Sequence, residues 1–207
     1  MRLRLGCEMT WDLIAPTPMI TLLNVHPSRT AQLVEPDRLR TWPPVRIEGY
    51  RDVFGNWCSR VLAPAGTFTI GTDGVVEADE TPDVQVTDAE QHAIEDLPAD
   101  ALQFLLGSRY CETDRMMDEA FRLFGWTKPG WQRAQAICEF VHNHITFDYA
   151  DARPTRTAWE AYQERKGVCR DFAHLAVTFC RCMNIPTRYC NGYISDVGTP
   201  PPYSPMD

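Results

Sequence analysis

The sequence predicts an α+β protein in which an N-terminal β-sandwich precedes a mainly helical half. The chain has 207 residues, of which 44% are hydrophobic, enough for one large packed domain or two small ones. As far as residue 88, short alternating apolar and polar stretches are separated by Gly, Pro, Asn and Asp, which is typical of strands and turns. Beyond that point apolar residues recur at helical spacing. We therefore predict domains at 1–88 and 89–207.

The first half is expected to form short strands joined by tight turns. Apolar residues occupy every second position from Leu3 to Trp11, so they line one face of a strand. Gly55 and Asn56 predict a hairpin turn, because both residue types accept positive φ, and Asp73 with Gly74 predicts another turn. Further strands are expected at 19–25, 45–50, 61–63, 68–70 and 75–76. This half contains no catalytic constellation, which favours a supporting role.

The second half is expected to be built from helices. Short helices are predicted at 99–106 and 114–124, and a longer one at 131–145. Thr157 and Glu160 have the spacing of a capping box, so the next helix should occupy 158–166. Gly167 is expected to end that helical run. The chain then becomes apolar at helical spacing again, and the shared face is predicted to hold Cys169, Phe172, Ala173, Ala176, Val177 and Cys180.

Cys169 is the candidate nucleophile, because it falls at the mouth of this last helix. A thiol in the first helical turn lies beside unpaired backbone N–H groups and the positive end of the helix dipole. Both favour the thiolate that a cysteine nucleophile needs, and the same N–H groups could stabilise an oxyanion. The alternative is that Cys169 is a small buried hydrophobe on a core helix.

At residues 166–175 the chain resembles the transglutaminase-like cysteine enzyme superfamily, in its bacterial branch. The family's Gly-x-Cys-x-Asp-(Phe/Tyr)-Ala-His-Leu segment is matched by Gly167, Cys169 and 171–175. The resemblance continues through 184–189 and Gly192-Tyr193, where the family has its first core strand. It also reaches 51–56, which looks like the N-terminal β domain that often precedes such cores. The implied fold of the second half is papain-like.

The resemblance implies that Cys169 belongs to a Cys-His-Asp triad. His174 lies five residues after Cys169, about 140° around the helix, so it should not be that cysteine's base. Family members carry the catalytic histidine in an Asp-(Phe/Tyr)-His-Ala-Trp segment, and Asp207 looks like the residue just before it. We therefore expect a core cut before the histidine and acid strands, inactive by itself. Asp171 is expected to support the nucleophile, and His174 to have a structural role.

Gln163 is a candidate oxyanion donor, because it precedes Cys169 by six residues, a spacing that papain-like enzymes use for their oxyanion glutamine. The alternative is an ordinary surface glutamine. A metal site is not expected: Cys180 and Cys182 would point about 160° apart on a helix, and the Cys-x-x-Cys spacing of structural zinc sites is missing. Cys180, Cys182 and Cys190 are expected to be packing thiols, and no cofactor is expected.

Charge and targeting signals restrict the partners. Ten acidic residues and no Lys or Arg lie between 61 and 108, so the net charge of −8 belongs to one segment and no basic stripe is available for nucleic acid. The N-terminus has no apolar signal core, and no apolar run approaches the length of a membrane span. We therefore expect a cytoplasmic location, reduced thiols and no membrane partner.

The implied activity is that of a cysteine protease or acyltransferase. The protein would act on peptide or glutaminyl amide bonds of a protein or peptide substrate, through a thioester on Cys169. Without a calcium-loop signature, transfer to water is favoured over transfer to an amine. The alternative function is a non-catalytic transglutaminase-like module for protein interaction.

Overall fold

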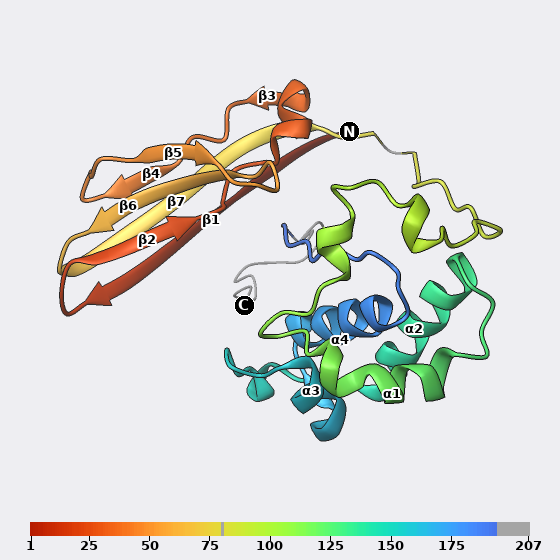
Figure 1. Ribbon diagram of the computed structural model, residues 1–207. Coiled ribbons are helices and arrows are strands. Elements are labelled where there is room, and N and C mark those ends of the chain that lie inside the picture. The colour runs from red at the N-terminus through yellow and green to blue at the C-terminus, as the bar shows by residue number, and fades with distance from the viewer. Residues whose placement is uncertain (80, 194–207) are drawn as a thin grey trace. The chain divides into compact units, whose positions relative to one another are not determined.

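The computed structural model describes residues 1–79 and 81–193. The chain divides into two compact units, Met1–Asp83 and Val84–Asp207. Strands dominate the first unit, which also has a 3-10 helix at Pro27–Gln32, and α-helices dominate the second (Figure 1), which confirms the α+β prediction. That these units are domains with the limits 1–88 and 89–207 stays a prediction.

The first unit is a sandwich of two antiparallel sheets. In one sheet β7 pairs with β1 at one edge and with β3 and β4 at the other; in the second the order is β2-β6-β5. The strands are β1 (Arg2–Leu13), β2 (Thr17–Thr21), β3 (Leu33–Glu35), β4 (Arg40–Trp42), β5 (Glu48–Arg51), β6 (Trp57–Ala63) and β7 (Gly66–Glu77). Val61 and Ala63 of β6 form the core with Phe68 and Ile70 of β7.

The turn predicted at Asp73 and Gly74 is wrong, because both residues lie inside the continuous strand β7. The predicted strands at 68–70 and 75–76 are therefore one strand. Residue 74 is a glycine because a side chain has no room there. A Cβ on Gly74 would lie 2.9 Å from the Cβ of Asp37 and 3.0 Å from its Cα. The glycine thus permits a close approach of another chain segment to the sheet.

The hairpin predicted at Gly55 is confirmed between β5 and β6, and Gly55 has a φ of 84°. Its turn is fixed by the Asp52 carboxylate, which accepts hydrogen bonds from the backbone N–H groups of Phe54 and Asn56. Strand β2 begins before the predicted 19–25 and ends at Thr21. It can include Pro18 because it lies at the edge of its sheet. The short strands β3 and β4 were not predicted, since three residues are too few to show alternation.

The second unit consists of helices and one short parallel strand pair. The α-helices are α1 (Thr113–Phe124), α2 (Trp131–His144), α3 (Ala158–Glu164) and α4 (Cys169–Cys182). Strands β8 (Thr146–Phe147) and β9 (Lys166–Gly167) form the pair. The predicted helix at 99–106 is only a 3-10 turn at Leu102–Leu105. The capping box of Thr157 and Glu160 is confirmed at the start of α3.

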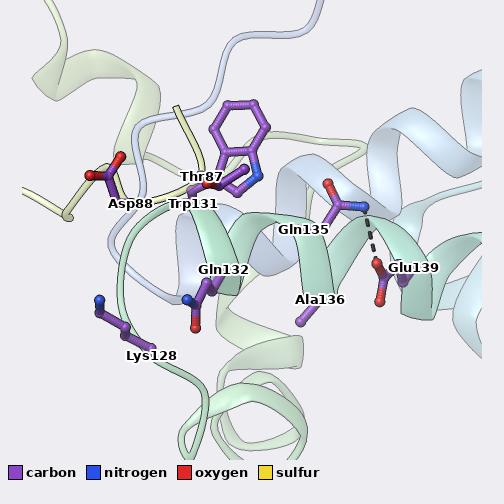
Figure 2. A pocket seen from close by; sticks show the side chains of 8 residues that line it. All are labelled: Thr87, Asp88, Lys128, Trp131, Gln132, Gln135, Ala136 and Glu139. Atoms are coloured by element: carbon purple, nitrogen blue, oxygen red, sulfur yellow. Dashed lines mark hydrogen bonds between the residues drawn. The ribbon is translucent and has the colours of Figure 1, made fainter. Parts of the chain in front are cut away.

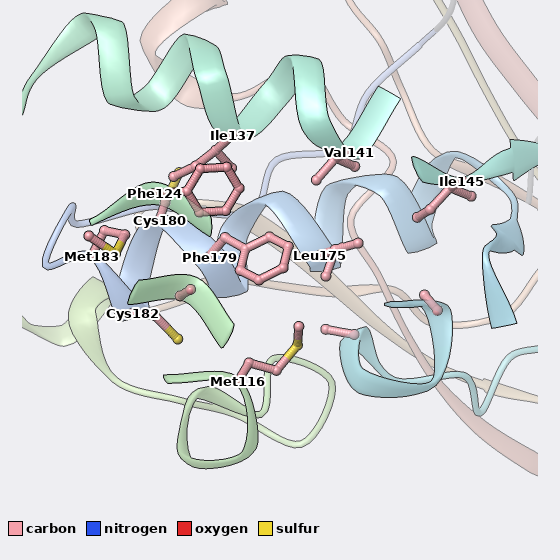
Figure 3. Packing of buried hydrophobic residues seen from close by; sticks show 13 residues of the cluster. Met116, Phe124, Ile137, Val141, Ile145, Leu175, Phe179, Cys180, Cys182 and Met183 are labelled. Atoms are coloured by element: carbon pink, nitrogen blue, oxygen red, sulfur yellow. The ribbon is translucent and has the colours of Figure 1, made fainter. Parts of the chain in front are cut away.

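Helix α4 is the centre of this unit. Leu175 and Phe179 are fully buried, and Figure 3 shows them between Ile137 and Val141 of α2 on one side and Met116 of α1 on the other. The predicted apolar face is therefore incomplete: it included Val177 and Cys180, which are buried, but it missed the two largest core residues of the helix. The reason is that α4 packs against α1, α2 and α3, so more than one face is covered.

The strand expected over 184–193 is not present. A strand needs a neighbouring backbone to accept its hydrogen bonds. Here the backbone bond from this stretch to a distant segment is the one from the Thr187 N–H to the Phe104 carbonyl, at 3.1 Å. Within the described ranges, no helix combines the length and apolar character needed to cross a bilayer.

Candidate active site

Cys169 is the first residue of α4 and is exposed. Val168 precedes it in an extended conformation, with φ −114° and ψ 179°, and caps the helix. The first N–H groups of a helix have no partner within the helix, so the accessible thiol lies beside free backbone donors. Cys169 is therefore not a buried packing residue, and its position suits attack on a carbonyl group whose oxygen needs donors.

Asp171 holds the start of this helix from the inside. Its side chain is 1% exposed, and its Oδ2 atom accepts a hydrogen bond of 2.9 Å from the Val168 N–H. This is the contact by which an acidic residue at the third helical position caps a helix. The same oxygen accepts a bond of 3.0 Å from Nη1 of Arg156, which is itself 3% exposed. A buried ion pair thus fixes the residue that precedes Cys169.

Gly167 is needed because of this carboxylate. A Cβ at Gly167 would lie 2.5 Å from Oδ2 of Asp171 and 2.7 Å from its Cβ. The prediction that Gly167 ends the preceding helix is wrong. Helix α3 already ends at Glu164, Arg165 takes the left-handed conformation with φ 56°, and Gly167 belongs to β9.

Arg156 joins three segments around the nucleophile. Besides Asp171, its guanidinium donates to the Asp151 carbonyl at 2.7 Å and to the Glu164 carboxylate at 3.1 Å. Sequence reasoning missed this residue. It sits in a stretch with two arginines and a proline that has no apolar periodicity, so nothing local distinguishes it from a solvated arginine.

The environment of His174 does not suit a catalytic base. Its ring stacks on Tyr110, with centroids 5.3 Å apart and planes at 9°, and also contacts the ring of Tyr189 at 5.1 Å. Burial lowers the pKa of the imidazole, and Arg170 adds to this effect. Within the described part of the chain its Nδ1 atom has no hydrogen-bond partner, and no hydrogen bond joins the ring to Cys169. A purely structural role agrees with this environment.

Tyr189 is a second residue beside His174 that was not predicted as part of the site. Burial raises the pKa of its hydroxyl; Arg170 opposes the rise, while the Cys169 and Cys111 thiols add to it. The tyrosine therefore lies near the nucleophile as well as against His174. Its ring contacts His174 and remains 39% exposed. Tyr189 lies in segment 184–189, which the family resemblance covers, so the sequence did hold a signal for it. That segment was instead predicted to form a strand.

Gln163 is exposed on α3. No hydrogen bond connects its side chain to α4 in the described ranges, so the oxyanion role of Gln163 stays a prediction. Of the four predicted site residues, the structure places Cys169 and Asp171 together at the start of α4. His174 lies further along the same helix, and Gln163 belongs to another.

The described surface also contains a hollow of about 460 Å³ along α2. Figure 2 shows Trp131, Gln132, Gln135 and Glu139 along that helix, with Asp88 and Lys128 beside them. Neither Cys169 nor any other predicted site residue lines it. We locate the chemistry at the thiol rather than in this hollow, because none of the residues that line the hollow is a cysteine.

The eight cysteines are free thiols in different environments. Burial raises the pKa of Cys180 and of Cys182 to about 11. Cys190 is exposed, so its assignment as a packing thiol is wrong. Cys138 is also exposed, yet partial burial of its sulfur and the neighbouring Glu139 raise the pKa of the thiol. Only three cysteines of the described ranges, Cys138, Cys169 and Cys190, are thus exposed to reagents.

Iodoacetamide should alkylate Cys169 faster than the seven other cysteines near neutral pH, because helix N-termini stabilise an anionic sulfur. Peptide mapping by mass spectrometry after timed quenching measures each rate. Cys190 is the matched control, since it is exposed but lies outside a helix. Equal rates at Cys169 and Cys190 would show that the helix does not activate the thiol.

Replacing Gly167 by Ala should lower the free energy of unfolding by about 1–3 kcal/mol, because the new methyl group overlaps a pinned carboxylate. Gly192→Ala is the control, since a Cβ there has nothing within 4 Å. Urea denaturation of both variants measures the difference. If the two substitutions have the same effect, the close approach of Asp171 to Gly167 is not a constraint.

Part of the chain is similar to a known protein family. The model of the Transglutaminase-like superfamily matches residues 120–203. An uncharacterized protein of Mycobacterium leprae is 25% identical over 173 residues, which are 81% of this chain and 61% of that protein. An uncharacterized protein of Mycobacterium tuberculosis (strain H37Rv) is 27% identical over 164 residues, with shares of 73% and 51%. The chain therefore spans 61% and 51% of the length of these curated relatives.

A solved structure matches most of the chain. The crystal structure of a candidate cysteine protease from Cytophaga hutchinsonii superposes with a TM-score of 0.78 and 27% sequence identity. The match covers 90% of this chain and 65% of the other. The segment recognised by the family model contains the exposed Cys169 and the whole of α4. Residues 120–203 thus match the Transglutaminase-like superfamily, and the chain is similar in fold to the candidate cysteine protease.

Proposed function

We propose that the protein of which this chain is part catalyses acyl transfer through a thioester on Cys169. Its substrate would be a peptide or glutaminyl-type amide. The observation that carries the proposal is the exposed thiol at the first position of α4, beside free backbone donors and above a buried capping carboxylate. An accessible cysteine at a helix N-terminus has the environment of a reactive thiolate.

The reaction would follow the two steps of covalent catalysis. The Cys169 sulfur adds to the amide carbonyl, whose oxygen becomes negative and accepts hydrogen bonds from N–H groups at the start of α4. The C–N bond then breaks, and the amine leaves with a proton from the general acid. Water adds to the thioester, the C–S bond breaks, and the carboxylic acid and the free thiol are released.

A base for the thiol proton is required, and we assign it to a histidine other than His174. The stacking of His174 on Tyr110 and the lowered pKa of its buried imidazole both favour a neutral structural ring. In triads of papain-like logic, the histidine approaches the thiol from another element and is oriented by an acid. The triad acid is likewise not Asp171, because Asp171 is occupied by Val168 and Arg156.

Water is the favoured acceptor. The solved structure that matches this chain is described as a candidate cysteine protease, which supports hydrolysis over transfer to an amine. A protein or peptide is the corresponding substrate class.

Replacing Cys169 by Ala in the full-length protein should abolish hydrolysis of fluorescently labelled casein, with a loss of about 10³-fold or more, because the nucleophile is removed. Labelling by a peptidyl vinyl sulfone should disappear as well. Cys190→Ala is the matched control and should retain both. If Cys169→Ala retains the activity, the nucleophile is wrong. If the wild type has neither activity nor labelling, the non-catalytic interaction module becomes the better description.

A further inference from the structure

We infer that Arg156 is a positioning residue for Cys169, acting through Asp171. The inference rests on the proposed function, because positioning has meaning only if Cys169 is the nucleophile. Arg156 touches neither the thiol nor the carbonyl-binding side of the helix in the contacts described above. Its effect passes from the guanidinium to the carboxylate, and from there to the Val168 N–H.

The burial of Arg156 indicates why a charged residue occupies this position. A guanidinium 3% exposed and a carboxylate 1% exposed have both lost most of their hydration, which is costly unless they are paired and hydrogen-bonded. Arg156 meets that requirement with Asp171, Glu164 and the Asp151 carbonyl. A hydrophobic side chain could fill the same volume more cheaply. The directional donors of the guanidinium are therefore the reason to expect a charged residue here.

The two carboxylate oxygens of Asp171 differ in their hydrogen bonds. Oδ2 of Asp171 accepts from both Val168 and Arg156, whereas Oδ1 has no hydrogen-bond partner within 1–79 and 81–193. The Arg170 guanidinium is 3.7 Å from Oδ1. Arg156 thus holds the carboxylate in the rotation that directs Oδ2 at Val168. Loss of Arg156 would free the carboxylate to turn toward Arg170.

The neighbouring arginine provides a contrast. Arg153 lies in the same loop, its side chain is 41% exposed, and it pairs with Glu160 and Glu164 at the surface. Exposed pairs of this kind contribute little to stability. Arg153 has no bond to Asp171, so its removal should leave the cap of α4 intact. It is the matched control for charge and location.

The experiment compares the wild type with Arg156→Met, Arg156→Lys and Arg153→Ala in the same protein. Hydrogen exchange at the Val168 amide reports the cap directly, and exchange at the Leu175 amide reports the helix core. The rate of Cys169 alkylation by iodoacetamide, divided by that of Cys190, reports the environment of the thiol. Thermal denaturation separates local from global effects.

Arg156→Met should accelerate exchange at Val168 by about tenfold while the Leu175 amide stays protected, because local opening precedes global unfolding. The Cys169-to-Cys190 rate ratio should change in parallel, Arg156→Lys should restore part of both values, and Arg153→Ala should leave them at wild-type levels. If Arg156→Met lowers the melting temperature but leaves the relative Val168 exchange and the rate ratio unchanged, Arg156 is only structural. Unlike loss of activity in Cys169→Ala, these readouts do not depend on catalysis.

Discussion

The buried carboxylate of Asp171 is the constraint on which the geometry of the site depends. It requires Gly167 to lack a side chain, it holds the extended Val168, and it needs Arg156 as a counter-charge. Removing one partner of a buried ion pair costs about 3–5 kcal/mol, because the other charge is left unpaired. Through Arg156 the same carboxylate connects the end of α3 to the start of α4.

The second unit is arranged so that one helix serves both the core and the chemistry. Phe179 and Leu175 anchor α4 among the other helices, while Cys169 at its first turn remains exposed. A nucleophile on a rigid, packed element keeps its position better than one on a loop. The hollow along α2 has mostly polar side chains on an exposed helix face and no cysteine among its lining residues. Architecture therefore favours the thiol as the functional centre.

Local signals in the sequence were sufficient where a structure is determined locally. The capping box of Thr157 and Glu160 and the helical spacing after Cys169 each predicted an element that the structure contains. Prediction failed where a residue is required by a contact that forms only in the folded chain. Gly74 makes room for Asp37, and Gly167 makes room for Asp171, but in the sequence both look like turn or stop signals. Arg156 is the clearest case, because its three partners are brought together only by the fold.

Whether Cys169 forms a covalent acyl-enzyme can be measured by intact-mass spectrometry of the full-length protein. The protein is mixed with an activated p-nitrophenyl ester of a short peptide and quenched in acid within the first turnover. We expect a mass increase of one acyl group, which hydroxylamine removes and which maps to the peptide that contains Cys169. An adduct on another cysteine, or turnover without an adduct that a rapid quench can trap, would contradict it.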